Sequence, residues 1–142
     1  MEIKGRNIAG HDDADAQYQL YFDCRDRGEN VECIKWLRKA AEHGIPEAWV
    51  NLGHCYHYGK GVVRDCRDAV KLYRKGARMD DALAFYNLGA CLINGIGCEG
   101  NAKEAVAWFR KAARRGNGFA SSEWWEWNVQ LSSIQYPVSI IQ

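Results

Sequence analysis

Apolar residues recur along the chain at the three- and four-residue spacing that places side chains on one face of a helix. Trp49, Leu52 and Tyr56 form one such stripe, and a second runs from Ala69 to Ala77. Only two prolines interrupt the 142 residues, so long stretches are free to be helical. The pattern predicts an all-α protein.

The same pattern returns at a fixed step. The segment EAWVNLGHCYHYGKGVVRD begins at Glu47, and LAFYNLGACLINGIGCEGN begins 36 residues later at Leu83. A second motif keeps this step, since WLRKAAEHG, LYRKGARMD and WFRKAARRG begin at Trp36, Leu72 and Trp108. A period of this size is typical of stacked helical hairpins, because one hairpin cannot bury its apolar face alone.

Each unit is expected to form two antiparallel helices, here called helix A and helix B. Gly53 and Gly89 mark the places where helix B comes close to helix A. The loops YGKGVVRD and NGIGCEGN contain paired glycines, which favour turns closed to other residues, and then an apolar residue that can pack back between the helices. The expected A and B helices are residues 15–27 with 31–43, 47–58 with 66–78, and 83–94 with 102–115, followed by a capping helix from about 119.

A chain of this length can bury one core of ordinary size, so a single domain over 1–142 is expected. The first repeat is the divergent one, because its loop RDRGENVE is about four residues shorter than the others and lacks the paired glycines. A tighter turn is expected there. The expected divisions are a first repeat at 15–46, a second at 47–82, a third at 83–118, and a capping helix and tail at 119–142.

The segment LGHCYHYGKGVVRDCRDAVKLYRKGA resembles the Sel-1-like repeat family, a relative of the tetratricopeptide repeat with a longer glycine-containing loop. The resemblance covers roughly Ala16 to Ala120. It implies a short right-handed α-solenoid that displays helix A residues on a concave surface. It also implies an adaptor or scaffold that binds a protein or peptide partner.

The residues of helix A that packing leaves free define the candidate binding surface. If the W-x2-L-G-x2-Y residues from Trp49 pack inward, the opposite face carries Val50 and Asn51. Asn87 is the equivalent of Asn51, and tetratricopeptide relatives use asparagines here to hydrogen-bond an extended peptide. The surface expected to bind a largely uncharged peptide consists of Asn51, His54, Tyr58, Tyr86, Asn87 and Asn94.

Six cysteines support an alternative, a disulfide-stapled member of an oxidising compartment. Such a protein would be secreted or lie in the mitochondrial intermembrane space, with a redox or cofactor-assembly role. Against it, Cys55 and Cys91 share a helix A position where a small buried side chain suffices, which favours free thiols. The possible pairs are Cys24 with Cys33, Cys55 with Cys66, and Cys91 with Cys98.

The remaining chemistry of the sequence is sparse. Lysine and arginine number 19 against 18 acidic residues, so the overall charge does not favour nucleic acid or an anionic membrane as a partner. No apolar run approaches the ~20 residues of a membrane span, and the first residues lack a signal-peptide core, so a cytoplasmic location is expected. His54 and His57, with Cys55 between them, could in principle share a metal on one helical face, but no clear carboxylate or thiolate cluster accompanies the pair, and no catalytic motif is present. We therefore expect no enzyme activity, no metal and no cofactor.

The C-terminal segment SSEWWEWNVQLSSIQYPVSIIQ is rich in tryptophan. Trp124 and Trp125 fall at the positions of Leu52 and Gly53 in the repeat, so at least one is expected to close the core. Trp127 is left over on the next turn. The tryptophans are interpreted either as a cap of the solenoid or as an anchor for a partner.

Overall fold

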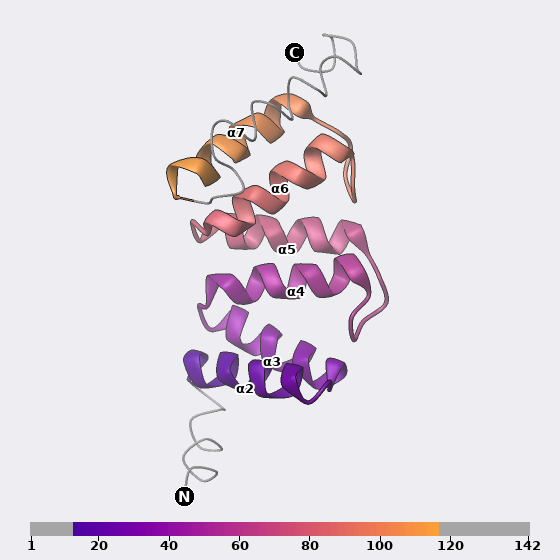
Figure 1. The fold of residues 1–142 in the computed structure, drawn as a ribbon, viewed down its shortest axis with the longest axis vertical. Helices are drawn as coiled ribbons and strands as arrows, with labels where there is room; N and C mark the ends of the chain where they lie inside the picture. The colour runs from indigo at the N-terminus through magenta and orange to yellow at the C-terminus, as the bar shows by residue number, and fades with distance from the viewer. Residues whose placement is uncertain (1–12, 117–142) are drawn as a thin grey trace, which may run out of the picture.

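The computed structural model describes residues 13–116, which form six α-helices and no strand. The helices stack in chain order from α2 at one end to α7 at the other (Figure 1). The predicted all-α solenoid is confirmed, and each helix begins and ends within one residue of its expected bounds. The expected capping helix and tail lie outside the described residues. Helices A are α2 (Ala14–Asp26), α4 (Pro46–Tyr58) and α6 (Ala82–Asn94), and helices B are α3 (Asn30–Glu42), α5 (Cys66–Arg78) and α7 (Ala102–Arg114).

Aspartate or asparagine caps the start of four of these helices. The carboxylate of Asp13 accepts hydrogen bonds from backbone amides in the first turn of α2. Asp65, Asp81 and Asn101 do the same for α5, α6 and α7. Such caps satisfy N–H groups that have no partner within the helix. Helix α4 begins instead with Pro46, whose fixed φ and missing N–H suit the first turn.

Glycines end α4 and α6 and begin the two long loops. Gly59 has a φ of 71° and Gly95 a φ of 66°, which is the left-handed conformation that other residues avoid. Val62 and Cys98 then pack back against the core, as predicted. In the first unit only residues 27–29 separate the two helices, which confirms the tighter turn.

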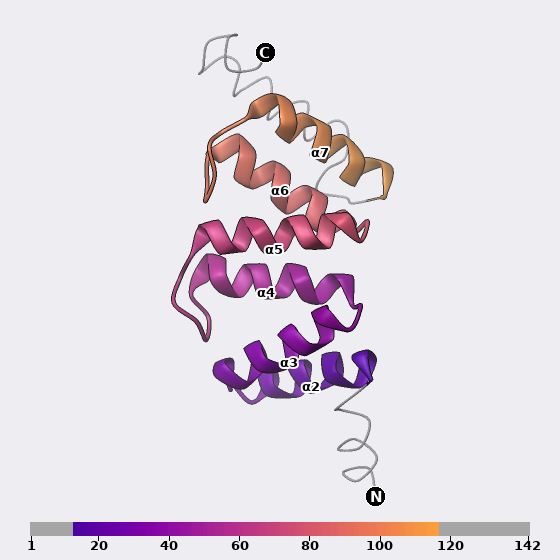
Figure 2. The same cartoon turned by 180° about the vertical axis from the view of Figure 1, so that it is seen from behind.

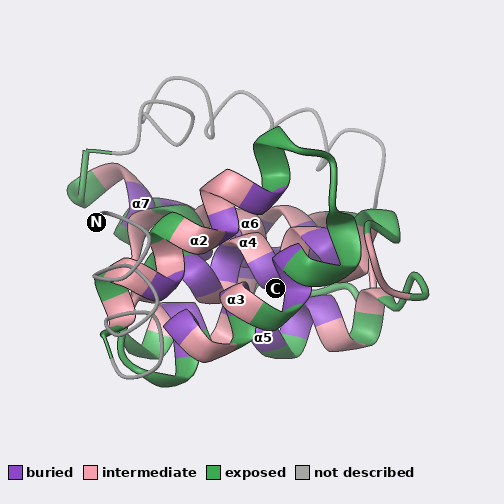
Figure 3. Cartoon of the chain, turned by 90° about the horizontal axis from the view of Figure 1, so that it is seen from below, coloured by how far each residue is buried: buried purple, intermediate pink, exposed green. Residues whose placement is uncertain are grey.

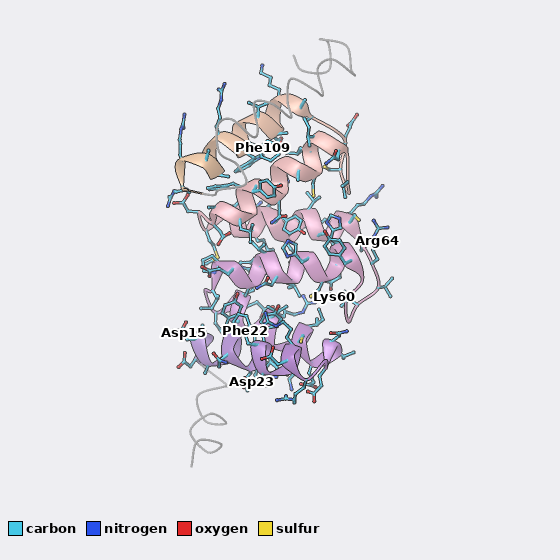
Figure 4. All side chains as sticks on the ribbon, in the orientation of Figure 1. Asp15, Phe22, Asp23, Lys60, Arg64 and Phe109 are labelled. Carbon is cyan, nitrogen blue, oxygen red and sulfur yellow. The ribbon has the colours of Figure 1, made fainter. Side chains whose placement is uncertain are left out.

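The second glycine of each long loop lies against the preceding repeat. Gly61 touches the backbone of Asn30 at the start of α3, and Gly97 touches the backbone of Cys66 at the start of α5. A side chain at either glycine would collide with that backbone. Both loops lie on the same edge of the stack (Figures 1 and 2), and Lys60 and Arg64 project from this edge (Figure 4). Each long loop therefore packs its own repeat against the preceding one.

Within the second and third hairpins, a glycine of helix A faces an aromatic ring of helix B. A Cβ added at Gly53 would lie 2.5 Å from Cε1 of Tyr73, and one added at Gly89 would lie 2.7 Å from Cε1 of Phe109. Tyr73 and Phe109 are buried, so neither ring has free space to retreat into. The close approach predicted from the sequence is confirmed.

In the first hairpin the larger side chain is on helix A and the smaller one on helix B. Tyr21 is the eighth residue of α2, as Gly53 is of α4, and Leu37 is the eighth residue of α3, as Tyr73 is of α5. Tyr21 and Leu37 are buried in one cluster. The first repeat thus fills its core with the larger residue on helix A. Viewed along the stack, the buried residues lie toward the interior and the exposed ones toward the outside (Figure 3).

Candidate protein-interaction surface

The six residues expected to bind a peptide come from two neighbouring helices A. Asn51, His54 and Tyr58 lie on α4, and Tyr86, Asn87 and Asn94 lie on α6. Helix α4 contacts α6 directly. We call these six residues the helix A surface.

Asn51 is held in place by a residue of the first repeat. Its Nδ2 donates a hydrogen bond to the hydroxyl of Tyr18 on α2, at 2.8 Å. No described residue donates a hydrogen bond to the Oδ1 of Asn51. The side chain is therefore fixed by its donor end, while its acceptor end has no hydrogen-bond donor among residues 13–116.

Asn87 is bound by its own protein at both ends of the amide. Its Nδ2 donates to the carbonyl of Leu83 at 2.9 Å, and its Oδ1 lies 3.4 Å from Nε2 of His54. Because Oδ1 can only accept, Nε2 of His54 carries the proton in this pair. The amide of Asn87 is therefore held at both ends by its own protein, through contacts that the sequence does not show.

The ring of His54 lies between the surface and the core. It makes an edge contact with Tyr73, with 5.6 Å between the ring centroids. Burial lowers the pKa of His54 below its ordinary value of 6.5, the hydrogen bond to Asn87 opposes this shift, and repulsion by His57 adds to it. The neutral imidazole is therefore the form that the fold favours.

Acid should destabilise the protein through His54. The unfolded chain takes up a proton at His54 at a higher pH than the folded chain does. The contribution of neutral His54 to the stability of the fold is therefore complete above the unfolded pKa of 6.5, and it is lost as pH falls through the folded pKa. We expect the melting temperature to fall between about pH 7.5 and about pH 5.5. His54→Gln, whose amide can still donate to Asn87, should reduce that fall. An equal fall in the variant would assign the acid sensitivity to other groups.

The remaining three residues of the helix A surface differ in exposure and position. Tyr58 is 69% exposed and its ring stacks on His57 with 4.5 Å between centroids. Asn94 is exposed and donates to the carbonyl of Ala90. Tyr86 is half-buried, and its ring tilts against Phe109 at 5.7 Å. Tyr58 and Asn94 end their helices at equivalent places, which gives the surface one aromatic and one amide group there.

Val50 does not lie on this surface. It was expected on the free face of α4, but it is 1% exposed, and its Cγ2 lies 3.3 Å from the Cβ position of Gly76 on α5. The absence of a side chain at Gly76 leaves room for Val50 against the next helix. The apolar stripe of α4 is therefore wider than the spacing motif alone predicted.

The sequence did not show that α2 places a residue beside the helix A surface. Tyr18 binds Asn51, and its ring contacts Phe22 at 4.8 Å and Tyr21 at 5.7 Å. Tyr18 is the fifth residue of α2, as Tyr86 is of α6. The shared position becomes visible once both helices are aligned by their first residues.

All six cysteines, which lie within the described residues, are free thiols. Burial raises the pKa of Cys55 to about 11 and that of Cys91 to about 12, which keeps these thiols protonated. Within residues 13–116, no group of three or more His, Cys, Asp or Glu could hold a metal ion. None of the described helices is long and apolar enough to cross a membrane.

Comparison with known proteins gives one consistent likeness. The family model described as Sel1 repeat matches residues 27–45, 46–81 and 82–117. The crystal structure of a Sel1 repeat protein from Oxalobacter formigenes is 30% identical, with a TM-score of 0.80, and the match covers 89% of this chain and 98% of that one. No curated protein matches the sequence.

Two further solved structures show the same fold. The protective antigen c5321 of uropathogenic Escherichia coli, which displays an SLR fold, is 29% identical with a TM-score of 0.78. That match covers 94% of this chain and 28% of the antigen. Cysteine rich protein B of Helicobacter pylori is 28% identical with a TM-score of 0.62, over 76% of this chain and 92% of that one.

Proposed function

The chain belongs to the Sel1 repeat family, and on that premise we propose that it is a non-catalytic adaptor whose concave helix A surface binds an extended, largely uncharged peptide of a partner protein. Proteins of this family generally act as protein-interaction modules. The family supports a binding role in general terms, and the surface and the kind of peptide follow from this chain's own residues.

The observation that carries the proposal is a row of polar side chains bonded across neighbouring helices A. Tyr18 on α2 binds Asn51 on α4, and His54 on α4 binds Asn87 on α6. These bonds fix the side chains before a ligand arrives. A surface ordered in advance loses less conformational entropy on binding, which favours affinity.

A peptide lying across this row would meet one fixed acceptor and exposed aromatic surface. The Oδ1 of Asn51 can accept from a peptide N–H, as in recognition of extended backbones. Tyr58 offers an exposed ring, and Leu83 adds an apolar side chain that is 39% exposed. Aromatic side chains give large contact area at low entropic cost.

The charge of the two helices favours an uncharged ligand. Helix α4 has Glu47 as its one charged residue, and α6 has no Asp, Glu, Lys or Arg. A surface without lysine or arginine gives no support to nucleic acid or an anionic membrane as its partner. Binding here should therefore depend only weakly on salt.

Removing the two asparagine amides should weaken the bound peptide by about 1–3 kcal/mol. The change is Asn51→Ala with Asn87→Ala, and the ligand is a synthetic peptide first selected on the wild-type protein from a random display library. Asn51→Ala alone should account for most of the loss, because Asn87 is already bound by Leu83 and His54. Isothermal titration calorimetry at two salt concentrations measures both the loss and the salt dependence.

Lys103→Ala, an exposed change on α7, is the matched control and should leave affinity unchanged. Circular dichroism must show equal helix content in all variants. Unchanged affinity in the folded double variant, or a steep loss of wild-type affinity with added salt, would move the binding site away from the helix A surface.

A further inference from the structure

Charge is divided unevenly between the two sets of helices, although the chain as a whole carries only +1. Helix α5 has five lysines and arginines against one aspartate, and α7 has four against one glutamate. The neighbouring helices A, α4 and α6, contain no lysine or arginine. The basic residues therefore gather on helices B of the second and third repeats.

A hollow of about 420 Å³ lies within this basic region. It is bordered by the end of α5, the first turns of α6 with the turn before them, and one face of α7; these three helices are adjacent in the stack (Figure 2). Its residues are Arg74, Ala77, Arg78, Asp80, Phe85, Trp108 and Lys111. We call it the basic hollow.

The half-buried ring of Trp108 forms the accessible apolar part of the basic hollow, and it stacks on the buried ring of Phe85. Phe85 and Trp108 lie 5.6 Å apart between centroids, with 23° between their planes. The Nζ of Lys111 lies 4.9 Å from the centroid of Trp108 and 5.8 Å from that of Phe85. An ammonium group over aromatic faces is held by the ring quadrupole, so Lys111 is kept beside the rings.

The cations of the basic hollow differ in whether they are already paired. Arg74 lies 3.3 Å from Glu104, and Asp80 forms an ion pair with Arg115. Arg78 has no carboxylate partner among residues 13–116, and Lys111 contacts aromatic rings rather than an acid there. The basic hollow therefore presents two uncompensated positive charges, one from α5 and one from α7.

We propose that the basic hollow binds an acidic segment of a partner protein, with a carboxylate between Arg78 and Lys111 and an apolar side chain against the half-buried ring of Trp108. Charge complementarity carries the choice of a carboxylate, and the half-buried ring of Trp108 carries the choice of an apolar neighbour. Glu104 and Asp80 interrupt the positive charge nearby, which disfavours a continuous polyanion such as nucleic acid.

The proposal goes beyond the helix A surface and predicts the opposite response to salt. The probe is a short fluorescein-labelled peptide in which two glutamates flank a phenylalanine, and the reference peptide carries glutamine in place of both glutamates. Fluorescence anisotropy with the full chain should show binding of the first peptide that weakens steeply with added salt. Binding of the glutamine peptide should be weaker by about tenfold.

Arg78→Glu and Lys111→Glu should each weaken the acidic peptide by about tenfold. Both side chains are exposed, so the fold should persist, and Arg78→Gln and Lys111→Gln repeat the test without a new negative charge. Lys103→Glu places the same charge change on α7 outside the basic hollow and should have little effect. Three results would overturn the proposal. They are an equal loss of affinity in Lys103→Glu, unchanged binding in Arg78→Gln and Lys111→Gln, and equal binding of an oligonucleotide of the same charge. So would self-association in sedimentation that is lost in Arg78→Glu, because the occupant would then be a second copy of the chain.

Discussion

Gly97→Ala is expected to lower the free energy of unfolding by about 3 kcal/mol or more. Gly97 has a φ of 68°, which alanine adopts only under strain, and the new methyl group would collide with the backbone of Cys66. That backbone is the capped first turn of α5 and cannot move without breaking the hydrogen bonds of Asp65. Urea unfolding followed by circular dichroism measures the change in midpoint.

Gly28→Ala separates the two causes of this loss. Gly28 also has a positive φ, of 75°, but an added Cβ would meet nothing within 4 Å, so only the strain of about 1–2 kcal/mol should appear. Gly61→Ala should behave like Gly97→Ala, because it collides with Asn30. Equal losses of unfolding free energy for Gly28→Ala and Gly97→Ala would show that the loop around Gly97 does not pack tightly against the preceding repeat.

Gly89→Val and Gly53→Val are expected to destabilise the protein by about 1–3 kcal/mol each through overpacking. Their first added carbon alone lies 2.7 Å from Phe109 or 2.5 Å from Tyr73, well inside contact distance. Valine is no worse than glycine in a helix interior, so propensity does not explain a loss. Thermal melting of both variants measures the effect, and wild-type curves would show that the helices do not approach closely here.

A second change should recover part of the stability lost in Gly89→Val. Phe109→Leu removes ring atoms from the contact and copies the first repeat, where the larger residue Tyr21 accompanies Leu37. We expect the double variant to be more stable than the sum of the two single losses predicts, with a coupling of about 0.5–3 kcal/mol. Additive losses would mean that the two side chains do not meet.

The helices and their pairing could be predicted because the information is local and repeated. The step of 36 residues aligns Leu72 with Trp108, and paired glycines mark the loops that need left-handed backbone. The contact of Gly97 with the preceding repeat could not be predicted, since loop composition shows the turn but not what the turn touches. The buried Gln17, whose Oε1 lies 2.8 Å from Nδ1 of His43, could not be foreseen for the same reason.

The sequence showed which helices carry the six candidate residues but not the hydrogen bonds that hold them. Helical spacing placed Asn51 and Asn87 at equivalent points of two helices, yet Asn51 is bound by Tyr18 and Asn87 by His54 and Leu83. These partners lie on neighbouring helices or on the preceding turn, and spacing within one helix does not show them. The basic hollow was missed because the summed charge of the chain hides the separation of charge between helices A and B.

Two-dimensional ¹H–¹⁵N NMR of the labelled protein, titrated with the peptide selected from the display library, tests the proposed function most directly. The side-chain amides of Asn51 and Asn87 give their own signals, which report on the helix A surface without any mutation. We predict the largest shift changes at these amides and at the backbone amides of His54, Tyr58 and Tyr86, with α5 and α7 little affected. Shift changes confined to α5 and α7, with the signals of Asn51 and Asn87 unmoved, would contradict binding on the helix A surface.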